Sequence, residues 1–310
     1  MRLTEEQIRS VAFGAVCIQK EERGLRFYKC TRKQIEAWAA KDAGLGERAA
    51  GCTGVRLDFH TDSDHIRFKA FGGTFELLVN DLVTHRFPAG EGAEFSASLE
   101  KGEKRITLLF PSHGSEGGLE WVELEDGATL QPHQYARKIL FIGDSITQGW
   151  NSDFDSCSYA WRVSRKLNAE SVINGIGGAY YLEDSFDPID FAPDTVVVAY
   201  GTNDYGHYKT QEELQKECSG FLNKIKEYYG EKKVFIILPP WRFDLEKVRP
   251  MGSFEDCRRI IQSEGEARGF TVIDGFQLVP HLEFFFADAL HPNAIGFAEY
   301  AKNLIRFLEQ

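Results

Sequence analysis

The chain has 310 residues, of which 43% are hydrophobic and 27% charged, a mixture typical of folded rather than disordered proteins. Lysine and arginine total 36 against 47 aspartate and glutamate residues, and the formal net charge of −11 argues against binding to nucleic acid or to anionic membranes. No apolar run approaches the ~18 residues of a membrane span. The N-terminus is polar and acidic, whereas a signal peptide needs a basic start and an apolar stretch. We therefore expect a cytoplasmic protein.

The cysteines are scattered along the chain, with no pair at the close spacing of a zinc site and no framework of the kind found in small secreted proteins. We expect free thiols and no metal site. The six cysteines are Cys17, Cys30, Cys52, Cys157, Cys218 and Cys257.

The first part of the chain has the period of β-strands. Apolar and polar residues alternate between residues 55 and 124, as in Val55, Leu57 and Phe59, and this pattern is typical of strands with one solvated face. Turns between short strands are expected at Gly72-Gly73, Gly90-Glu91-Gly92 and Asp126-Gly127, and this pattern suggests a β-sandwich. Strands are expected at residues 66–70, 74–79, 105–110 and 119–125, and short amphipathic helices at residues 4–10 and 32–41.

After residue 135 short runs of branched residues alternate with helical periods, which predicts a parallel sheet covered on both faces. Thr210 and Glu213 are spaced as a capping box at the start of one helix. The predicted domains are therefore a β-sandwich over residues 1–135 and an α/β domain over residues 136–310. The α/β strands are expected at residues 139–142, 172–173, 195–199, 234–238 and 271–273, and the helices after residues 210, 253 and 293.

Two segments of the α/β half contain the residue types of a hydrolytic triad. Gly143-Asp144-Ser145 follows the first predicted strand, where ligands bind in open α/β sheets. A serine nucleophile needs a histidine base and an acid to orient it, and His291 stands three residues after Asp288. Each segment alone is weak evidence for catalysis. A serine at a turn is usually only a helix cap, and a histidine three residues after an aspartate can be incidental. The GxSxG elbow of α/β-hydrolases is absent.

Two further strand ends offer donors for an oxyanion, which requires preorganised N–H groups. The second predicted strand runs into a glycine-rich segment in which Gly175, Gly177 and Gly178 are all candidates, and the third runs into Gly201-Thr202-Asn203-Asp204. The backbone N–H of Ser145 would be another donor. A dinucleotide fingerprint in the glycine segment would require glycine where Tyr180 stands, so a nucleotide-binding reductase is disfavoured.

The order of these four segments resembles the SGNH, or GDSL-like, hydrolase superfamily, over about residue 138 to the C-terminus. The resemblance implies a flavodoxin-like three-layer α/β/α fold with Ser145 as nucleophile, His291 as base and Asp288 orienting it. It also implies Gly178 and Asn203 as oxyanion donors. Members often have asparagine five residues before the block-two glycine, where this chain has Ile173, so the choice among the glycines stays open.

The two-part layout also resembles bacterial family-two carbohydrate esterases, which place a jelly-roll β-sandwich before an SGNH domain and remove acetyl groups from sugars. Aromatic residues near the motifs are candidates for contacts to a sugar, although aromatic rings more often lie in the core. The candidates are Trp150, Tyr180, Tyr205 and Trp241.

We therefore expect a serine esterase that acts through an acyl-enzyme on a small acyl ester, such as an O-acetyl group on a carbohydrate, and needs no cofactor. The expected partner is a small acylated substrate rather than nucleic acid or a membrane. The alternatives are a lysophospholipase or thioesterase using the same residues, and a non-catalytic carbohydrate-binding protein. All proposed chemical groups follow residue 138, so the first 135 residues are expected to shape or occlude the substrate site, or to stabilise the hydrolase, without supplying nucleophile or base.

Overall fold

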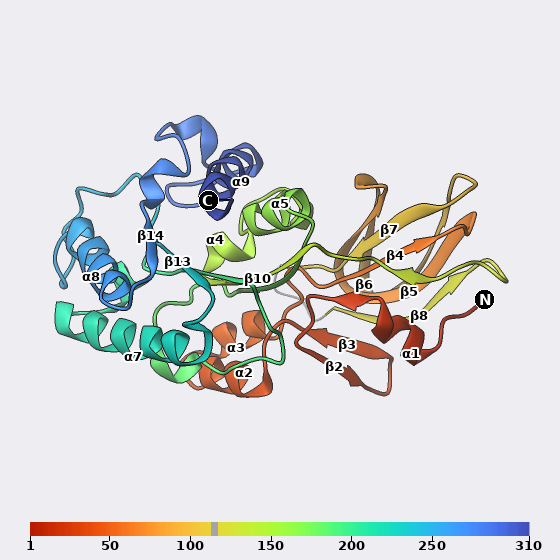
Figure 1. Ribbon diagram of the computed structural model, residues 1–310, viewed down its shortest axis with the longest axis horizontal. Helices are drawn as coiled ribbons and strands as arrows, with labels where there is room; N and C mark the ends of the chain where they lie inside the picture. The colour runs from red at the N-terminus through yellow and green to blue at the C-terminus, as the bar shows by residue number, and fades with distance from the viewer. Residues whose placement is uncertain (113–116, 310) are drawn as a thin grey trace.

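The computed structural model describes residues 1–112 and 117–309, which form an antiparallel sheet, sheet A, and a parallel sheet, sheet B, flanked by helices (Figure 1). Sheet A lies at the N-terminal end of the molecule and sheet B at the other. The strands of sheet A are β1 (Ala12–Phe13), β2 (Cys17–Lys20), β3 (Leu25–Tyr28), β4 (Arg56–Thr61), β5 (His65–Val79), β6 (Leu82–Ser98), β7 (Lys104–Leu109), β8 (Gly118–Leu124) and β9 (Gln131–Pro132).

Sheet A curls because its longest strands bend. The described strands follow the order β1-β4-β7-β5-β8-β3-β2, with β6 paired to β5 and β9 to β4. The first part of β5 pairs with β8 and its last part with β7, so one strand passes from one set of neighbours to another. The prediction of an antiparallel N-terminal domain is confirmed, and its assignment as a jelly roll stays a prediction.

Two turns predicted in this domain are wrong. Gly72-Gly73 lies inside β5 and Gly90 to Gly92 inside β6, and residues 82–98, for which no strand was predicted, form one long strand. The β5–β6 pairing has a register shift between Ala70 and Gly72, and Gly72 has a φ of 107°. Glycine within a strand marks a bulge as readily as a turn, and here it bends the strand without ending it.

Sheet B contains five parallel strands in the order β11-β10-β12-β13-β14. This is the 2-1-3-4-5 order of doubly wound folds, in which the chain reverses direction across the sheet after its second strand. The α/β prediction is thereby confirmed. The strands are β10 (Arg137–Gly143), β11 (Ala169–Gly175), β12 (Thr195–Ala199), β13 (Lys233–Ile237) and β14 (Thr271–Ile273).

Helices cover both faces of sheet B. Helices α5 and α9 bury their apolar residues against one face, and α7 and α8 cover the other. The predicted capping box of Thr210 and Glu213 is confirmed at the start of α7. The α-helices are α1 (Glu5–Ser10), α2 (Arg32–Ala39), α3 (Ala43–Ala49), α4 (Ser145–Gln148), α5 (Tyr159–Lys166), α6 (Asp204–His207), α7 (Gln211–Tyr229), α8 (Phe254–Glu266) and α9 (Ala294–Leu308). The 3₁₀ turns are η1 (Asp155–Cys157), η2 (Glu183–Ser185), η3 (Gly275–Gln277) and η4 (Glu283–Phe285).

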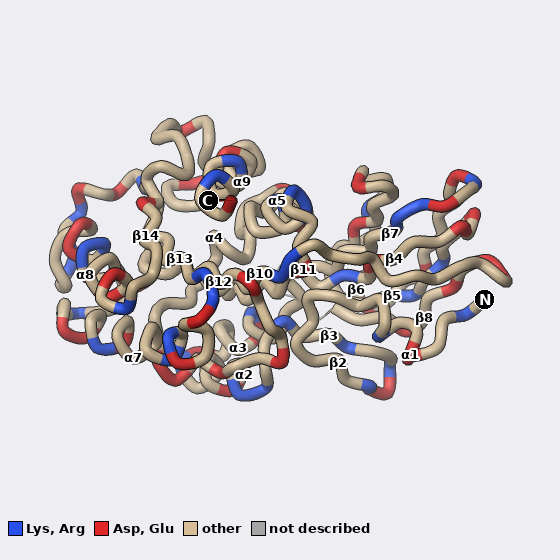
Figure 2. The backbone as a smooth tube through the Cα atoms, viewed as in Figure 1, with Lys and Arg blue, Asp and Glu red and all other residues tan. Residues whose placement is uncertain are grey.

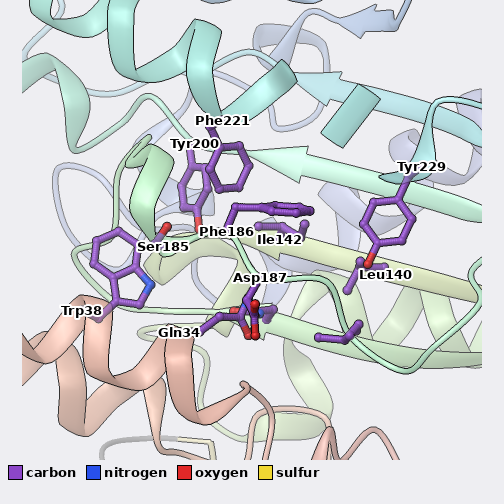
Figure 3. A pocket seen from close by; sticks show the side chains of 12 residues that line it. Gln34, Trp38, Leu140, Ile142, Ser185, Phe186, Asp187, Tyr200, Phe221 and Tyr229 are labelled. Carbon is purple, nitrogen blue, oxygen red and sulfur yellow. The ribbon is translucent and has the colours of Figure 1, made fainter. Parts of the chain in front are cut away.

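The α2–α3 hairpin packs on sheet B although it interrupts the strands of sheet A in sequence. Trp38 and Leu45 belong to the same core cluster as Leu140 and Tyr200. Trp38 and Gln34 on α2 face the side chains of sheet B across a residual cavity of about 10 Å³, which is room for about one water (Figure 3). A division at residue 135 separates the two sheets, but this hairpin completes the core of the second sheet.

Charged residues of both signs are distributed over both halves of the chain (Figure 2). None of the helices within residues 1–112 and 117–309 combines the length and the apolar composition that crossing a bilayer requires.

Candidate active site

The topology of sheet B brings several of the predicted segments to one edge. In the 2-1-3-4-5 order the central strands β10 and β12 are neighbours whose following loops depart to opposite faces, and ligands bind in the crevice between such loops. Ser145 follows β10, and Asn203 follows β12. Ser145 and Asn203 therefore lie at the crevice between the loops that follow β10 and β12.

Ser145 is the first residue of α4, directly after the end of β10. A Cβ on Gly143 would stand 2.1 Å from Thr147 Oγ1, so only glycine permits this close turn. The Asp144 carboxylate caps the helix by accepting a hydrogen bond from the Ile146 N–H at 2.9 Å. Burial raises the pKa of Asp144 to about 7. The cap and the glycine hold Ser145 in place with 5% of its surface exposed.

A chain of hydrogen bonds joins Ser145 to His291 and Asp288. Ser145 Oγ lies 2.9 Å from His291 Nε2, and His291 Nδ1 lies 2.8 Å from Asp288 Oδ2. Asp288 Oδ1 accepts the backbone N–H groups of Leu290 and His291, and Oδ2 accepts the amide of Asn151 at 2.7 Å. Partial burial raises the pKa of Asp288, but the hydrogen bonds from His291 and Leu290 outweigh it and the pKa is lowered. The carboxylate stays ionised and orients the imidazole.

The three candidate glycines occupy different positions. Gly175 is the last residue of β11. The N–H of Gly177 donates to Gln148 Oε1 at 2.7 Å and is therefore engaged. Gly178 has a φ of 84°, borders the same cavity as Ser145, and has no acceptor for its N–H within the described part of the chain. Of the three glycines, Gly178 has the N–H that is available to a ligand.

Asn203, in the segment after β12, is hydrogen-bonded to the glycine-rich segment after β11. Its amide nitrogen donates one hydrogen to Ala179 O at 2.9 Å, which leaves the other hydrogen available. Asp204, fully buried behind it, accepts the N–H groups of Tyr181 and Gly201, each at 2.8 Å. Burial raises the pKa of Asp204 to about 7. Asp204 thus ties together the backbones of the two loops that flank the site.

The serine, the histidine and the candidate donors open on one cavity of about 250 Å³. Its lining combines the apolar side chains of Trp150 and Leu290 with N–H donors, which suits an ester whose carbonyl oxygen becomes negative during reaction. Its lining residues are Arg48, Ser145, Trp150, Gly177, Gly178, Asn203, Leu290 and His291.

Of the aromatic candidates, Trp150 lines this cavity. Trp241 does not line it, because its ring packs among other rings: it contacts Phe243 and Phe286 at centroid distances of 4.6 and 5.3 Å and stacks on His281. Trp241 and Phe243 lie in the loop after β13, and their rings pack that loop against Phe286.

The two tyrosines also lie outside the cavity lining. The ring of Tyr180 is 6% exposed, stacks on His207 and meets the edge of Trp38. Tyr205 is fully buried, donates its hydroxyl hydrogen to a backbone carbonyl and packs against Phe254. These rings complete the core between the site and α2, α7 and α8.

Two polar residues at the site were not identified from the sequence. Arg48 on α3 lines the cavity and donates from Nε to Gly177 O at 2.6 Å, across 129 residues of chain. Asn151 holds Asp288 across 137 residues. Neither lies in a motif, so no local signal pointed to them. Arg48 belongs to the first 135 residues, which were expected to act on the site without supplying the nucleophile or the base.

Comparisons with known proteins agree with this architecture. The model of the GDSL-like lipase/acylhydrolase family matches residues 141–298. Of the solved structures, the salicylyl-acyltransferase SsfX3 from a tetracycline biosynthetic pathway is similar, with a TM-score of 0.84 and 17% identity over 96% of this chain and 93% of that one. No curated protein matches the chain.

Two family-two carbohydrate esterases also share the fold. The one from Clostridium thermocellum, solved with cellohexaose, has a TM-score of 0.73 and 14% identity over 96% of this chain and 97% of that one. The one from Cellvibrio japonicus has a TM-score of 0.69 and 15% identity over 96% and 94%. The resemblance found in the sequence is thereby confirmed. Because the family model spans half of the chain, from β10 into α9, the chain belongs to the GDSL-like lipase/acylhydrolase family.

Proposed function

We propose that the protein is a serine esterase that removes a small acyl group, in the first place an O-acetyl group on a carbohydrate. Ser145 Oγ attacks the ester carbonyl carbon while His291 Nε2 takes its proton. The tetrahedral oxyanion is held by the N–H groups of Ser145 and Gly178 and the amide of Asn203. The alkoxide leaves with the proton of His291, and water then hydrolyses the acyl-serine by the same steps.

The observation that carries the proposal is the hydrogen-bonded chain from Ser145 through His291 to Asp288, which opens on the cavity with the candidate donors. A serine that is only a helix cap has no need of an imidazole whose other nitrogen is fixed by a carboxylate. The chemistry needs no further group, because the triad supplies nucleophile, base and orienting acid.

The size of the cavity favours a small acyl group over a lipid. Its volume of about 250 Å³ is below the roughly 300–1,000 Å³ typical of sites for drug-sized ligands. A lysophospholipase or thioesterase with these residues would need more apolar volume for its chain. The carbohydrate part of the proposal draws on the similar structures, which include family-two carbohydrate esterases and an acetyl xylan esterase. In this proposal residues 1–135 form an accessory domain that shapes the substrate site.

A second candidate is transfer of the acyl group to an alcohol other than water, because an acyl-serine reacts with either nucleophile. The similarity to an acyltransferase over nearly the whole chain favours testing it. Adding acceptor alcohols during turnover and measuring the ratio of transferred to hydrolysed product distinguishes the two activities.

The experiment is a panel of nitrophenyl esters from acetyl to dodecanoyl, followed by acetylated sugars, with the wild type and Ser145→Ala. We expect a preference for the acetyl ester and a loss of several orders of magnitude in Ser145→Ala with an unchanged melting temperature, since nucleophile and base act as a unit. Retention of even a tenth of the activity by the variant would mean that Ser145 is not the nucleophile.

A further inference from the structure

Side chains bind both backbone polar groups of Gly177, its N–H and its C=O, and the C=O belongs to the peptide that joins Gly177 to Gly178. Gln148 Oε1 accepts the Gly177 N–H at 2.7 Å, and Gln148 is itself fixed by donating to Ser112 O at 2.7 Å. On the other side Arg48 Nε donates to Gly177 O at 2.6 Å. In a trans peptide the carbonyl of one residue and the N–H of the next point in opposite directions. The arginine therefore fixes the direction of the Gly178 N–H.

Arg48 forms no salt bridge with the carboxylates of the described residues. Within residues 1–112 and 117–309 no carboxylate lies within salt-bridge distance of Arg48, and its guanidinium donates to the Gly177 carbonyl. A hydrogen bond from a cation is short and strong. It also polarises the peptide that it contacts, so the N–H at the other end becomes a better donor. Arg48 also lines the cavity that Ser145 lines.

The hairpin that carries Arg48 is firmly seated. Gly46 on α3 packs so closely on α2 that a Cβ there would stand 2.6 Å from the Ala39 Cβ. Trp38 and Leu45 are 1% and 6% exposed, and Trp38 meets the edge of Tyr180, two residues after Gly178, with ring centroids 5.4 Å apart. The cavity left under α2 has room for only about one water (Figure 3). The arginine thus extends from a packed element and does not need to be ordered during reaction.

We propose that Arg48 is a positioning residue of the oxyanion site, which aims and polarises the Gly177–Gly178 peptide from the N-terminal half of the chain. The inference rests on the proposed function, because an oxyanion forms only if Ser145 attacks an ester. It makes the α2–α3 hairpin part of the catalytic machinery rather than an accessory to substrate binding.

The test measures steady-state kinetics on p-nitrophenyl acetate for Arg48→Met, Arg48→Ala and Arg48→Lys in the full chain. We expect Arg48→Met to lower kcat by about 10- to 100-fold, less than the ~10²–10³ lost with an oxyanion donor itself, and to leave KM within about twofold. Methylguanidinium added to Arg48→Ala should restore part of kcat, because it can occupy the vacated position beside Gly177 O. The control is Arg32→Met on α2, whose side chain is 86% exposed, and it should match the wild type.

The outcomes separate the possible roles of Arg48. An unchanged kcat in a folded Arg48→Met overturns the proposal. A raised KM confined to esters that carry a carboxylate also overturns it, and would make Arg48 a substrate contact. If Arg48→Met unfolds, Arg48→Lys decides, since a folded lysine variant with wild-type kcat contradicts the need for the guanidinium Nε. Wild-type hydrolysis that Ser145→Ala abolishes is established first, so failure of the proposed function is seen separately.

Discussion

At the scale of single residues, we expect unequal effects for Asp288, which contacts His291, and for Asn151, which contacts Asp288. Asp288→Asn should lower kcat/KM by about 10⁴, because an amide that donates toward Nδ1 favours the wrong tautomer of the imidazole. Asn151→Gly removes one hydrogen bond to Asp288 and keeps the φ of 63° accessible, so we expect a loss of only about tenfold. Kinetics on nitrophenyl acetate check both. A loss below tenfold in Asp288→Asn would mean that another acceptor holds the imidazole.

Asn203 should act on the transition state rather than on substrate affinity. The amide hydrogen that Ala179 O does not engage is available to the developing oxyanion, so Asn203→Ala should lower kcat by ~10²–10³ with little change in KM. Asn203→Asp is a useful companion, because a carboxylate of the same shape repels the oxyanion. An unchanged kcat with a raised KM would place Asn203 in substrate binding instead.

The buried carboxyl of Asp144 predicts a dependence of stability on pH. Burial raises its pKa to about 7, so between about pH 4 and pH 7 the folded protein keeps a proton that the unfolded chain has lost. The contribution of Asp144 to the free energy of unfolding is therefore full below that window and decreases as pH rises through it. Asparagine does not titrate and keeps an acceptor for the Ile146 N–H.

Urea unfolding of the wild type and Asp144→Asn at pH 5 and pH 8 measures this effect. The stability of the variant relative to the wild type should rise between the two values, by up to roughly 3 kcal/mol. The comparison cancels the other titrating groups, including Asp204, as long as their pKa values do not change. A difference that stays constant with pH would show that Asp144 is ionised throughout.

The residues that could be predicted at this scale are those that lie in short motifs. Ser145 and Asp144 are adjacent, and Asp288 is three residues from His291, so local spacing is enough to propose a relation between them. Arg48 could not be predicted, because its contact depends on how a hairpin from one half of the chain packs against the other half.

At the scale of elements, the α2–α3 hairpin is the part whose packing matters most for the site. Trp38→Ala should destabilise the protein by about 3–5 kcal/mol, because it empties a buried site between α2 and sheet B. Its partner Tyr180 follows the glycine turn closely, so kcat should fall even in the molecules that remain folded. Denaturant unfolding together with kinetics tests this, and a loss below about 1 kcal/mol would contradict the assigned packing.

Helices and strands could be predicted where their sequence signals lie within a few neighbouring residues. The helix after residue 210 was recognised from its capping box and the strands of sheet B from branched runs, since both signals lie within a few residues of each other. The bends of β5 and β6 were not predicted, because glycine permits a turn and a bulge equally and the pairing partners decide between them.

At the scale of the whole molecule, residues from both halves of the chain line the candidate site. The 2-1-3-4-5 order of sheet B leaves a crevice at the ends of β10 and β12, and Arg48 on α3 lines the cavity there. A fragment that begins at residue 135 lacks Arg48 and exposes the apolar surface that α2 covers. A boundary at residue 135 therefore separates the two sheets, but it does not separate the two cores, because the α2–α3 hairpin packs on sheet B.

The central claim is that Ser145 carries the acyl group, and the most direct measurement is the mass of the peptide that contains it. Protein mixed with p-nitrophenyl acetate and quenched in acid within one turnover should gain the mass of one acetyl group on the peptide with Ser145. Ser145→Ala should gain none there and should release no burst of nitrophenol. Acetylation that persists in Ser145→Ala at the wild-type rate, or that maps to another side chain during turnover, would contradict the account.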